Sequence, residues 1–485
     1  MLNPVDLTIF VLYIIGLLGL GYYFHRKNRD GDDFYAGGRS INSTNIGLSV
    51  VATDVGGGFS IGLGGLGFVM GIAGSWMLFT GLIGAWLAAV FLIPKVKSNP
   101  AFERAFTFPQ IFSHFYDKRV ALVAGIISAI GYMGFTSSQL LAGAKLAEGT
   151  FVGMSLQTAL LIMGFIVVGY TVLGGLKAVI YTDTIQWIIL MVGLILVGLP
   201  VAYHAIGGMD AIRATVQPEM LSLTNISWQE FVSWSVTIIP IWFVGMTLYQ
   251  RIYASRDVKT AQRAWFIAGL FEWPLMAFMG VLLGLFARVA ADQGMFAAFG
   301  AVDVAAMDPE TGLPMLLSTV LPVGLMGIMM AAYFSAILST ADSCLMASSG
   351  NIVFDIIGHF REMDPDSFTF LRYSQVMTLL IGVLALIIAW SMENVLDLML
   401  YSYAFMVSGL FVPVIGALYW DRGTPEAALT AMIAGGGTTI LLQTVGAEMP
   451  FGLDANVYGL AVSAISFIII SYMTQPREIE KMETF

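Results

Sequence analysis

Residues 49–60 read SVVATDVGGGFS and lie in an apolar run, 46–70, whose only charged residue is Asp54. A run of this length can cross a hydrocarbon layer about 30 Å thick as a helix. In a helix interior, glycine costs about 1 kcal/mol relative to alanine. The three successive glycines from Gly56 to Gly58 therefore predict a membrane helix that is broken here and exposes backbone carbonyls, which can bind a cation. The alternative is that the glycines only allow two helices to cross closely.

The composition is that of an integral membrane protein. Of the 485 residues, 58% are hydrophobic and 11% are charged, whereas about 25% are charged in an ordinary soluble domain. The mean hydropathy is +0.82, and apolar runs of about 18 or more residues recur along the chain, as spanning helices require. No region is polar enough to form a separate soluble domain. We therefore expect residues 1–485 to form one all-α transmembrane domain.

The apolar runs predict about thirteen transmembrane helices. Their expected positions are about 6–24, 44–70, 74–94, 120–147, 153–173, 179–205, 229–250, 262–288, 317–354, 373–391, 397–419, 425–444 and 456–474. Cytoplasmic loops are enriched in Lys and Arg, and most basic residues, Arg251 among them, fall in loops on one side of this arrangement. Only Lys145, Arg213 and Arg288 fall on the other side. We expect a multi-pass protein of the plasma (inner) membrane, with the N-terminus outside and the C-terminus in the cytoplasm.

Several ionisable residues fall within the predicted spans, where each costs at least about 2.5 kcal/mol and is a candidate for function. They are Asp54, Lys145, Glu148, Asp183, Glu272 and Asp342. Asp183 and Gln186 have the spacing of a reinforced helix N-cap, so a cap and a cation site both remain open for Asp183. Lys145 and Glu148 lie one helical turn apart and are expected to pair or to reach the membrane interface.

Asp54 and Glu272 are candidates for groups that bind a cation or a proton. Glu272 directly precedes Trp273 and Pro274, and a proline frees a backbone carbonyl in a helix. One interpretation of Glu272 is a group that binds and releases a proton. The other is a neutral carboxyl that is hydrogen-bonded within the bundle.

The ninth predicted span contains a row of hydroxyl groups. Ala336, Ser339, Thr340 and Ser343 have the spacing that puts them on one face of a helix, with Asp342 at its edge. Hydroxyls on one face can replace part of the hydration shell of a small cation. The alternative is that they bond to carbonyls of their own helix or pack against a neighbour.

Several ordered motifs together resemble the sodium:solute symporter family, which includes sodium-coupled carriers of proline, sugars, pantothenate, choline, iodide and sialic acid. The motifs cover nearly the whole chain. They are DDFYAGGRSI (32–41), TFPQIFSHFYDKR (107–119), GAKLAEGTF (143–151), GGLKAVIYTDTIQ (174–186), YQRIYASRD (249–257), SAILSTADS (335–343), NIVFDI (351–356) and YSYAFMVSGLFVPVIGALYW (401–420).

The resemblance implies a LeuT-type core of two inverted five-helix repeats, at about 44–205 and 229–419, with one helix before and two after. The first helix of each repeat is expected to be broken, at the glycines after Asp54 and at Pro240 and Gly245. The resemblance also implies a sodium site. Its ligands would be the carbonyls of Ala52, Val55 and Ala336 and the hydroxyls of Ser339 and Thr340.

Some family members bind a second cation, and the resemblance makes Asp183, Asp342 and Ser343 a possible second cation site. Asp342 departs from the family pattern, because a hydroxyl is expected at its position, so the number of coupled ions stays open. The solute is expected between the two breaks. Its predicted wall consists of Gly56, Phe59, Phe135, Gln139, Trp242, Met246, Tyr401 and Phe405.

We expect a secondary active transporter that carries a small organic solute into the cell with sodium by alternating access, and not an enzyme. The coupling ion would be Na+, and the other partners are the solute and membrane lipid, with no nucleic acid and no obligate protein partner. A proton-coupled symporter of the same fold is the first alternative, using Asp54, Asp342 or Glu272. A membrane solute sensor is the second, but only about a dozen residues follow the last predicted span, too few for an output domain.

Overall fold

The computed structural model describes residues 3–26, 41–103, 105–361, 364, 367–446 and 449–474. Within these ranges the chain is helical, and one isolated bridge between Ile41 and Ser255 is its only β-type pairing. The predicted all-α fold is confirmed.

The longer helices form the body of the bundle. They are α1 (Pro4–His25), α3 (Ser43–Val55), α4 (Gly57–Met70), α5 (Trp76–Leu87), α8 (Lys118–Thr150), α9 (Leu156–Gly193), α12 (Trp228–Val244), α13 (Met246–Ala254), α14 (Val258–Phe271), α15 (Phe278–Asp292), α16 (Pro309–Val320), α17 (Leu325–Gly350), α19 (Phe368–Trp390), α20 (Val395–Tyr419), α21 (Pro425–Val445) and α22 (Ala455–Met473). Shorter pieces connect them, among them α6 (Ile93–Lys97), α7 (Gln110–Phe115), α10 (Leu199–Ala205), α11 (Gly208–Thr215) and α18 (Gly358–Phe360).

Nine helices in the described ranges are long and apolar enough to cross a membrane, and the bent pair of α12 and α13 would make a tenth. The predicted number of thirteen is not confirmed. Some predicted spans are too short to pass the same test, such as Pro4–Gly19 and Leu156–Val172, and others merge because helical structure continues through the connecting turn, as in Ser60–Lys97.

Polar residues at the ends of the apolar runs fix where several helices begin. Asp117 accepts hydrogen bonds from the backbone N–H groups of Arg119 and Val120 at 2.8 and 2.9 Å and so caps α8. Ser227 and Asp257 cap α12 and α14 in the same way. A side-chain acceptor at this position satisfies N–H groups that have no partner inside the helix.

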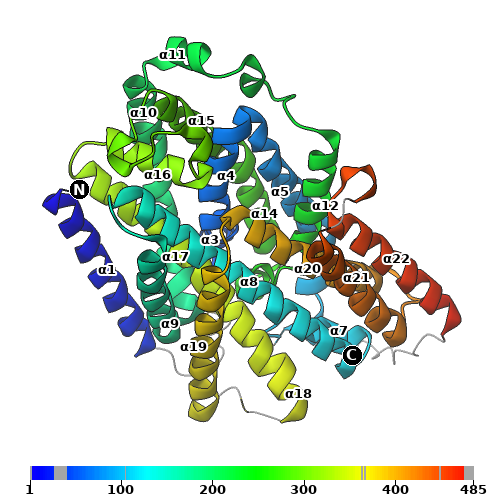
Figure 1. The fold of residues 1–485 in the computed structure, drawn as a ribbon. Helices are drawn as coiled ribbons and strands as arrows, with labels where there is room; N and C mark the ends of the chain where they lie inside the picture. Colours follow the sequence, from blue (N-terminus) through cyan, green and yellow to red (C-terminus); the bar gives the residue numbers. More distant parts are fainter. Residues whose placement is uncertain are drawn as a thin grey trace.

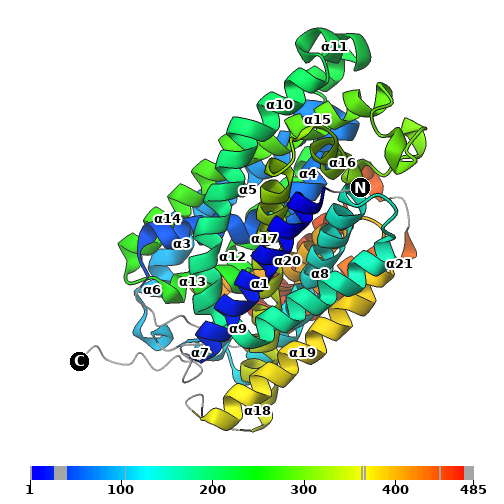
Figure 2. The ribbon, with the colours of Figure 1, turned by 90° about the vertical axis from the view of Figure 1, so that its left-hand side faces the viewer.

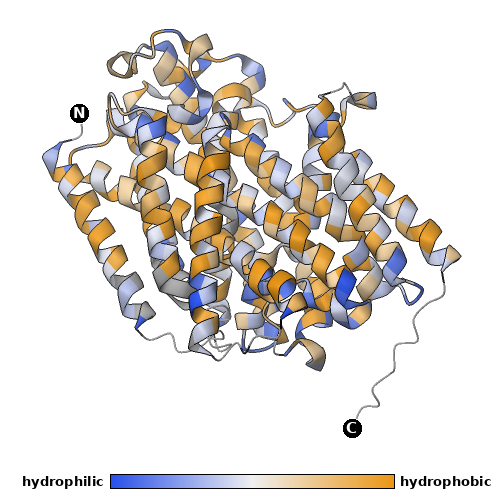
Figure 3. Ribbon diagram, turned by 60° about the horizontal axis from the view of Figure 1, so that its bottom comes forward, coloured by the Kyte–Doolittle hydropathy of each residue, from blue (hydrophilic) through white to orange (hydrophobic). Residues whose placement is uncertain are grey.

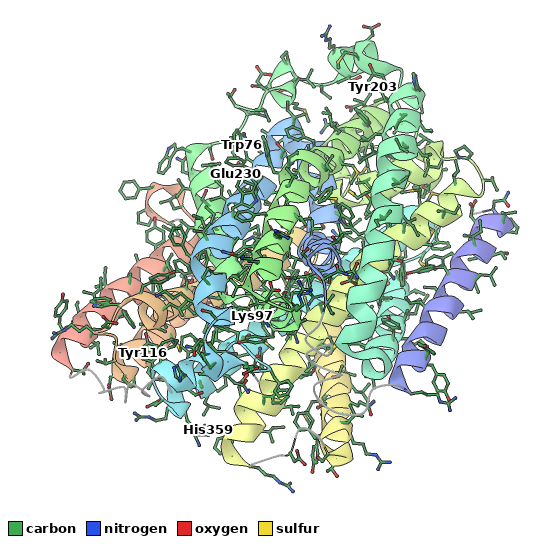
Figure 4. The ribbon with its side chains drawn as sticks, turned by 180° about the vertical axis from the view of Figure 1, so that it is seen from behind. Trp76, Lys97, Tyr116, Tyr203, Glu230 and His359 are labelled. Carbon is green, nitrogen blue, oxygen red and sulfur yellow. The ribbon has the colours of Figure 1, made fainter. Side chains whose placement is uncertain are left out.

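The helices form one bundle with two distinct ends. In Figure 1, α11 and α16 lie at the upper end, where the N-terminus also lies, and α7 and α18 lie at the lower end. A view from the side shows α1 running along the outside of the bundle (Figure 2). Tyr203, Trp76 and Glu230 mark the upper end in Figure 4, and Tyr116 and His359 mark the lower end.

The outer surface of the bundle is apolar, as a lipid-facing surface requires. Colouring by hydropathy shows long helices that are mainly hydrophobic along their lengths (Figure 3). Large apolar side chains point outward, including Phe165 at 82% exposed and Ile387 at 61%. The polar side chains that lie inside the bundle are therefore the candidates for function.

Two contacts join α1 to α17, although α1 precedes the predicted repeats. Asp6 is buried, and its Oδ1 accepts hydrogen bonds from the N–H groups of Gly324 and Gly327 at 2.7 and 2.8 Å. Farther along α1, the Tyr13 hydroxyl contacts the hydroxyl of Ser335 and accepts from Gln186 Nε2 at 3.0 Å.

The expectation that Lys145 pairs with Glu148 or reaches the interface is wrong, because Lys145 is buried against Asp308 and Glu310.

Candidate functional site

The helix that opens the predicted first repeat is broken. α3 ends at Val55, α4 begins at Gly57, and Gly56 between them has φ −19° and ψ −155°, outside the helical region. A side-chain carbon on Gly56 would lie only 2.0 Å from Thr340 Oγ1 on α17. The glycine therefore permits a close approach of two helices as well as the break, so both interpretations of the glycine triplet apply.

The predicted break in the second repeat also exists. α12 ends at Val244 and α13 begins at Met246, and the two helices are bent by 40° about Gly245. Pro240, the other predicted weak point, lies inside α12. The division into two inverted repeats stays a prediction.

Three of the predicted sodium ligands lie together at the first break. Thr340 Oγ1 is 3.1 Å from the carbonyl oxygen of Ala52 and 3.2 Å from that of Ala336. Ala52 belongs to the last turns of α3, and the other two residues belong to α17. Two carbonyl oxygens and a hydroxyl within hydrogen-bond distance are the hard oxygen donors that a small cation takes.

Ser339 completes this donor set from the neighbouring position on α17. Its hydroxyl oxygen is buried and has no hydrogen-bond partner among the described residues. Val55 is the last residue of α3, next to the break, but its side chain, like those of Asp54 and Phe59, lies outside the described part of the structure. The oxygen set fits a sodium ion, and the roles predicted for Asp54, Val55 and Phe59 stay predictions.

Asp183 lies next to this set, in the interior of α9 rather than at a helix start. The N-cap interpretation is therefore wrong. Asp183 is fully buried; Ser49 donates to its Oδ2 at 2.6 Å, and Ser339 lies beside it. Its other oxygen, Oδ1, is buried and has no partner among the residues that the structure describes.

Arg251 is the largest difference from the sequence prediction. It was expected in a cytoplasmic loop, but it lies in the last turn of α13 and is fully buried. Its Nη2 lies 3.6 Å from Asp183 Oδ2 and donates to Ser343 Oγ at 2.8 Å. Sequence reasoning missed this residue because an arginine at the end of an apolar run resembles a loop charge. Its burial could have been suspected from its position one helical turn after Thr247, because that spacing puts both side chains on the same face of the helix.

The three residues of the possible second cation site do not surround one common position. Ser343 and Asp183 both contact the Arg251 guanidinium, whereas Asp342 accepts a hydrogen bond from Thr171 on α9. Asp342 is buried. A guanidinium group therefore lies where the sequence predicted a second cation.

Part of the predicted solute wall lies at the first break. Gln139 on α8 accepts a hydrogen bond from the Gly57 N–H at 2.7 Å. Phe135, one turn before Gln139, is buried and packs edge-on against Tyr403 of α20, with ring centroids 4.9 Å apart. Gly56, Phe135 and Gln139 are therefore brought together.

Other predicted wall residues point elsewhere. Trp242 packs against Gly84 of α5 and Trp265 of α14. The Met246 sulfur accepts from the Phe108 N–H at 3.2 Å. None of these contacts reaches the first break, whereas Met246 is the first residue after the second break, at Gly245.

The register of α20 also differs from the prediction. Tyr401 is 49% exposed, and Phe405 packs against Gly436 of α21. Met399 and Tyr403 contact the residues near the break instead, since a side-chain carbon on Gly58 would lie 2.5 Å from Met399 Sδ. Both stripes of α20 are apolar and aromatic, so no sequence pattern distinguishes them.

Glu272 contacts α5. It is buried at the start of a π-helical segment, Glu272–Ala277, and faces α5, where a side-chain carbon on Gly81 would lie 2.3 Å from its Oε2. A coupling role for Glu272 stays a prediction.

Comparison with known proteins agrees with the motifs. The profile of the sodium:solute symporter family matches residues 34–435. The chain belongs to the sodium:solute symporter family. As a member of this family it is an integral membrane symporter coupled to sodium, and it is not an enzyme.

Relatives of this symporter cover nearly its whole length. The high-affinity proline transporter PutP of Bacillus subtilis is 27% identical over 474 residues, which cover 95% of this chain and 96% of the relative. The sodium/proline symporter of Escherichia coli is 26% identical and covers 96% and 93%. The sodium/pantothenate symporter of the same organism is also 26% identical, with 95% and 94% covered.

A solved structure supports the fold of this symporter. A sodium-coupled sialic acid symporter, in a substrate-bound outward-open state, superposes with a TM-score of 0.80 over 98% of this chain and 99% of that one. The sequence identity is 20%. The likeness therefore shows a shared fold, and it says nothing about the solute.

Proposed function

We propose that this symporter takes up a small amino acid or a related zwitterion, and that its sodium ion binds between α3 and α17. The observation that carries the proposal is the 3.1 Å contact between Thr340 Oγ1 and the carbonyl oxygen of Ala52 beside the break. A cation held by Ala52 and Val55 on one side, and by Ala336, Ser339 and Thr340 on the other, would join the two helices.

Binding of sodium would favour the arrangement in which the solute pocket is complete. α3 and α17 supply donors to the same ion, so the ion binds tightly only when these helices are close together. Departure of the ion removes that attraction and lets the helices separate. One charge that crosses a potential of 100 mV contributes about 2.3 kcal/mol, and at a factor of ten per 1.4 kcal/mol it supports about forty-fold accumulation of solute.

The chemistry around the start of α4 favours a solute with a carboxylate. The N-terminus of a helix carries partial positive charge and unpaired N–H groups, which attract anions. The Gly57 N–H, the first of α4, already donates to Gln139 Oε1, so Gln139 would hold the start of α4 in place beside the carboxylate. Phe135, Tyr403 and Met399 would contact the apolar body of the solute.

A sugar would need more hydrogen-bonding side chains than this wall supplies. Several relatives are named as proline carriers, which agrees with a small zwitterion. We therefore choose L-proline as the first probe.

Uptake into proteoliposomes tests this function. Radiolabelled L-proline should accumulate when a sodium gradient is imposed, and Ser339→Ala with Thr340→Ala should raise the sodium concentration required for half-maximal uptake. Unchanged sodium dependence in that double variant would contradict the site. Uptake driven by a pH gradient without sodium would favour the proton-coupled alternative, and sodium-dependent binding without uptake would favour a sensor.

We also infer that the end of the bundle with α11 and α16 faces the outside. Basic residues such as Lys118 and Arg361 belong to the other end, as cytoplasmic loops require. The single cysteine, Cys344, is buried, so a new cysteine can report on access. In intact cells an impermeant thiol reagent should label Thr224→Cys and should not label Ser113→Cys; the reverse pattern would invert the orientation.

A further inference from the structure

Arg251 carries a positive charge into the interior of the bundle. Its guanidinium and the Asp183 carboxyl are both completely buried, with 3.6 Å between Nη2 and Oδ2. Burial of two charges costs several kcal/mol for each ion unless pairing and hydrogen bonds compensate. The surroundings of the pair must therefore supply further polar contacts.

Hydroxyl groups on two helices supply these contacts. Arg251 Nη2 donates to Thr53 Oγ1 on α3 and to Ser343 Oγ on α17, each at 2.8 Å. Ser49 Oγ on α3 lies 3.3 Å from the same nitrogen and donates to Asp183. The guanidinium therefore joins α3, α9 and α17 to its own helix, α13.

The wall around the guanidinium has the chemistry of a cation site. It contains one carboxylate, three hydroxyls and the carbonyl oxygen of Thr247, to which Arg251 Nη1 donates at 3.3 Å, and oxygen groups of this kind bind hard cations such as sodium. The negative charge of Asp183 needs one positive charge nearby, and Arg251 supplies it. In the residues that the structure describes, no other Lys or Arg forms an ion pair with Asp183.

This pocket adjoins the proposed sodium site. Ser339 belongs to the sodium-binding set and also lies beside Asp183. Ser339 Oγ and Asp183 Oδ1 are both buried, and apart from the proximity of Ser339 to Asp183 neither oxygen has a hydrogen-bond partner among the described residues. These two oxygens are therefore available to a cation while Asp183 Oδ2 stays paired with Arg251.

We propose that Arg251 takes the place of a second coupling ion and limits this protein to one sodium ion in each transport cycle. The proposal rests on the sodium site described under the proposed function. Since the guanidinium is covalently attached to α13, it stays in the protein when sodium leaves. Its removal would leave Asp183 with the hydroxyls of Ser49, Thr53 and Ser343, a set that would bind a second sodium ion.

Counting bound ions tests the proposal without measuring transport. Equilibrium binding of radioactive sodium to purified protein in nanodiscs should give one ion for the wild type and two for Arg251→Ser. Arg251→Lys keeps the charge and should bind one ion. The double variant Arg251→Gln with Asp183→Asn removes both charges and should also bind one.

Thermal unfolding gives a second readout. Removal of one partner of a buried pair leaves a buried charge that destabilises the fold, and a bound sodium ion would compensate for it. The melting temperature of Arg251→Ser should therefore keep rising with sodium at concentrations where the wild type has reached its plateau, because each bound ion adds its own stabilisation.

Three results would overturn the inference. They are two sodium ions bound to the wild type, two bound to the double variant, or one bound to a folded Arg251→Ser that still binds solute. The number of sodium ions bound to the wild type can overturn the inference even if Arg251→Ser does not fold. A wild type that binds no sodium would instead overturn the proposed function, so the two failures are distinct.

Discussion

The ammonium of Lys145 on α8 lies 2.7 Å from Oε2 of Glu310 on α16, although 165 positions separate the two residues in the chain. Asp308 lies 2.6 Å from the same ammonium. Glu310 also accepts hydrogen bonds from the N–H groups of Val395 and Leu396, each at 3.0 Å. One buried ion pair therefore joins α8, α16 and the first turn of α20 at the upper end of the bundle (Figure 1).

Replacement of this lysine should destabilise the protein strongly. Lys145→Met leaves the Glu310 carboxylate buried without its cation, and such a loss typically costs about 3 kcal/mol. Thermal unfolding of the purified protein measures the effect. The control is Asp292→Asn, which removes the partner of Arg288 in a partly exposed pair and should cost less than about 1 kcal/mol. Equal effects of the two variants would show that burial of the Lys145 pair does not matter.

A side chain at Gly56 should weaken the sodium site. In Gly56→Ala the new carbon would lie 2.0 Å from Thr340 Oγ1, so α3 and α17 must move apart. We expect at least a ten-fold higher sodium concentration for half-maximal uptake, which is about 1.4 kcal/mol. Gly16→Ala is the matched control, because among the described residues no atom outside its own helical turn lies within 4 Å of the added carbon. Wild-type sodium dependence in Gly56→Ala would refute the close packing at the break.

Loss of the Gln139 amide should weaken binding of the solute more than binding of sodium. Gln139→Leu removes the acceptor for the Gly57 N–H, and a buried donor left unpaired costs about 1–3 kcal/mol. We expect the KM for proline to rise by about ten-fold or more, with a smaller change in sodium dependence. Ser137→Ala is the control, since the hydrogen bond of the Ser137 hydroxyl within the described residues goes to the Met133 carbonyl of its own helix. A larger change in sodium dependence than in KM would assign Gln139 to the ion site.

The Tyr13 hydroxyl should position α17 from outside the core. It contacts Ser335, the neighbour of the proposed ligand Ala336, and it accepts from Gln186. Tyr13→Phe should raise the sodium concentration required for half-maximal uptake by a few fold, while the maximal rate changes less. Tyr22→Phe on the exposed face of the same helix should leave both quantities unchanged. An unaltered sodium requirement in Tyr13→Phe would limit α1 to a structural role.

The first break and the row of hydroxyls on α17 could be predicted from local patterns, whereas the second break and the sodium ligand set came from the resemblance to a known family. Glycines next to Asp54 weaken any helix, and the spacing of Ala336 and Thr340 puts their oxygens on one face whatever lies around them. The resemblance to a known family then indicated which helix faces which.

Rotation of a helix about its axis and the burial of a single charge could not be predicted in the same way. α20 has two apolar stripes, and only packing against α8 and α21 selects the stripe with Tyr403 over the one with Tyr401. Arg251 resembled a loop residue because its partners, Asp183 and Ser343, lie far from it in the chain. Pairs of this kind depend on tertiary contacts that no local pattern encodes.

The attachment of α1 to α17 by Asp6 and Tyr13 has a consequence for the surrounding lipid. Along the rest of α1, Leu12 and Ile15 are 63% and 60% exposed and face the hydrocarbon. If α17 moves when sodium leaves, α1 must move with it and displace acyl chains. The turnover rate should therefore depend on bilayer thickness and fluidity, because displacement of lipid adds to the energy barrier of each transport cycle.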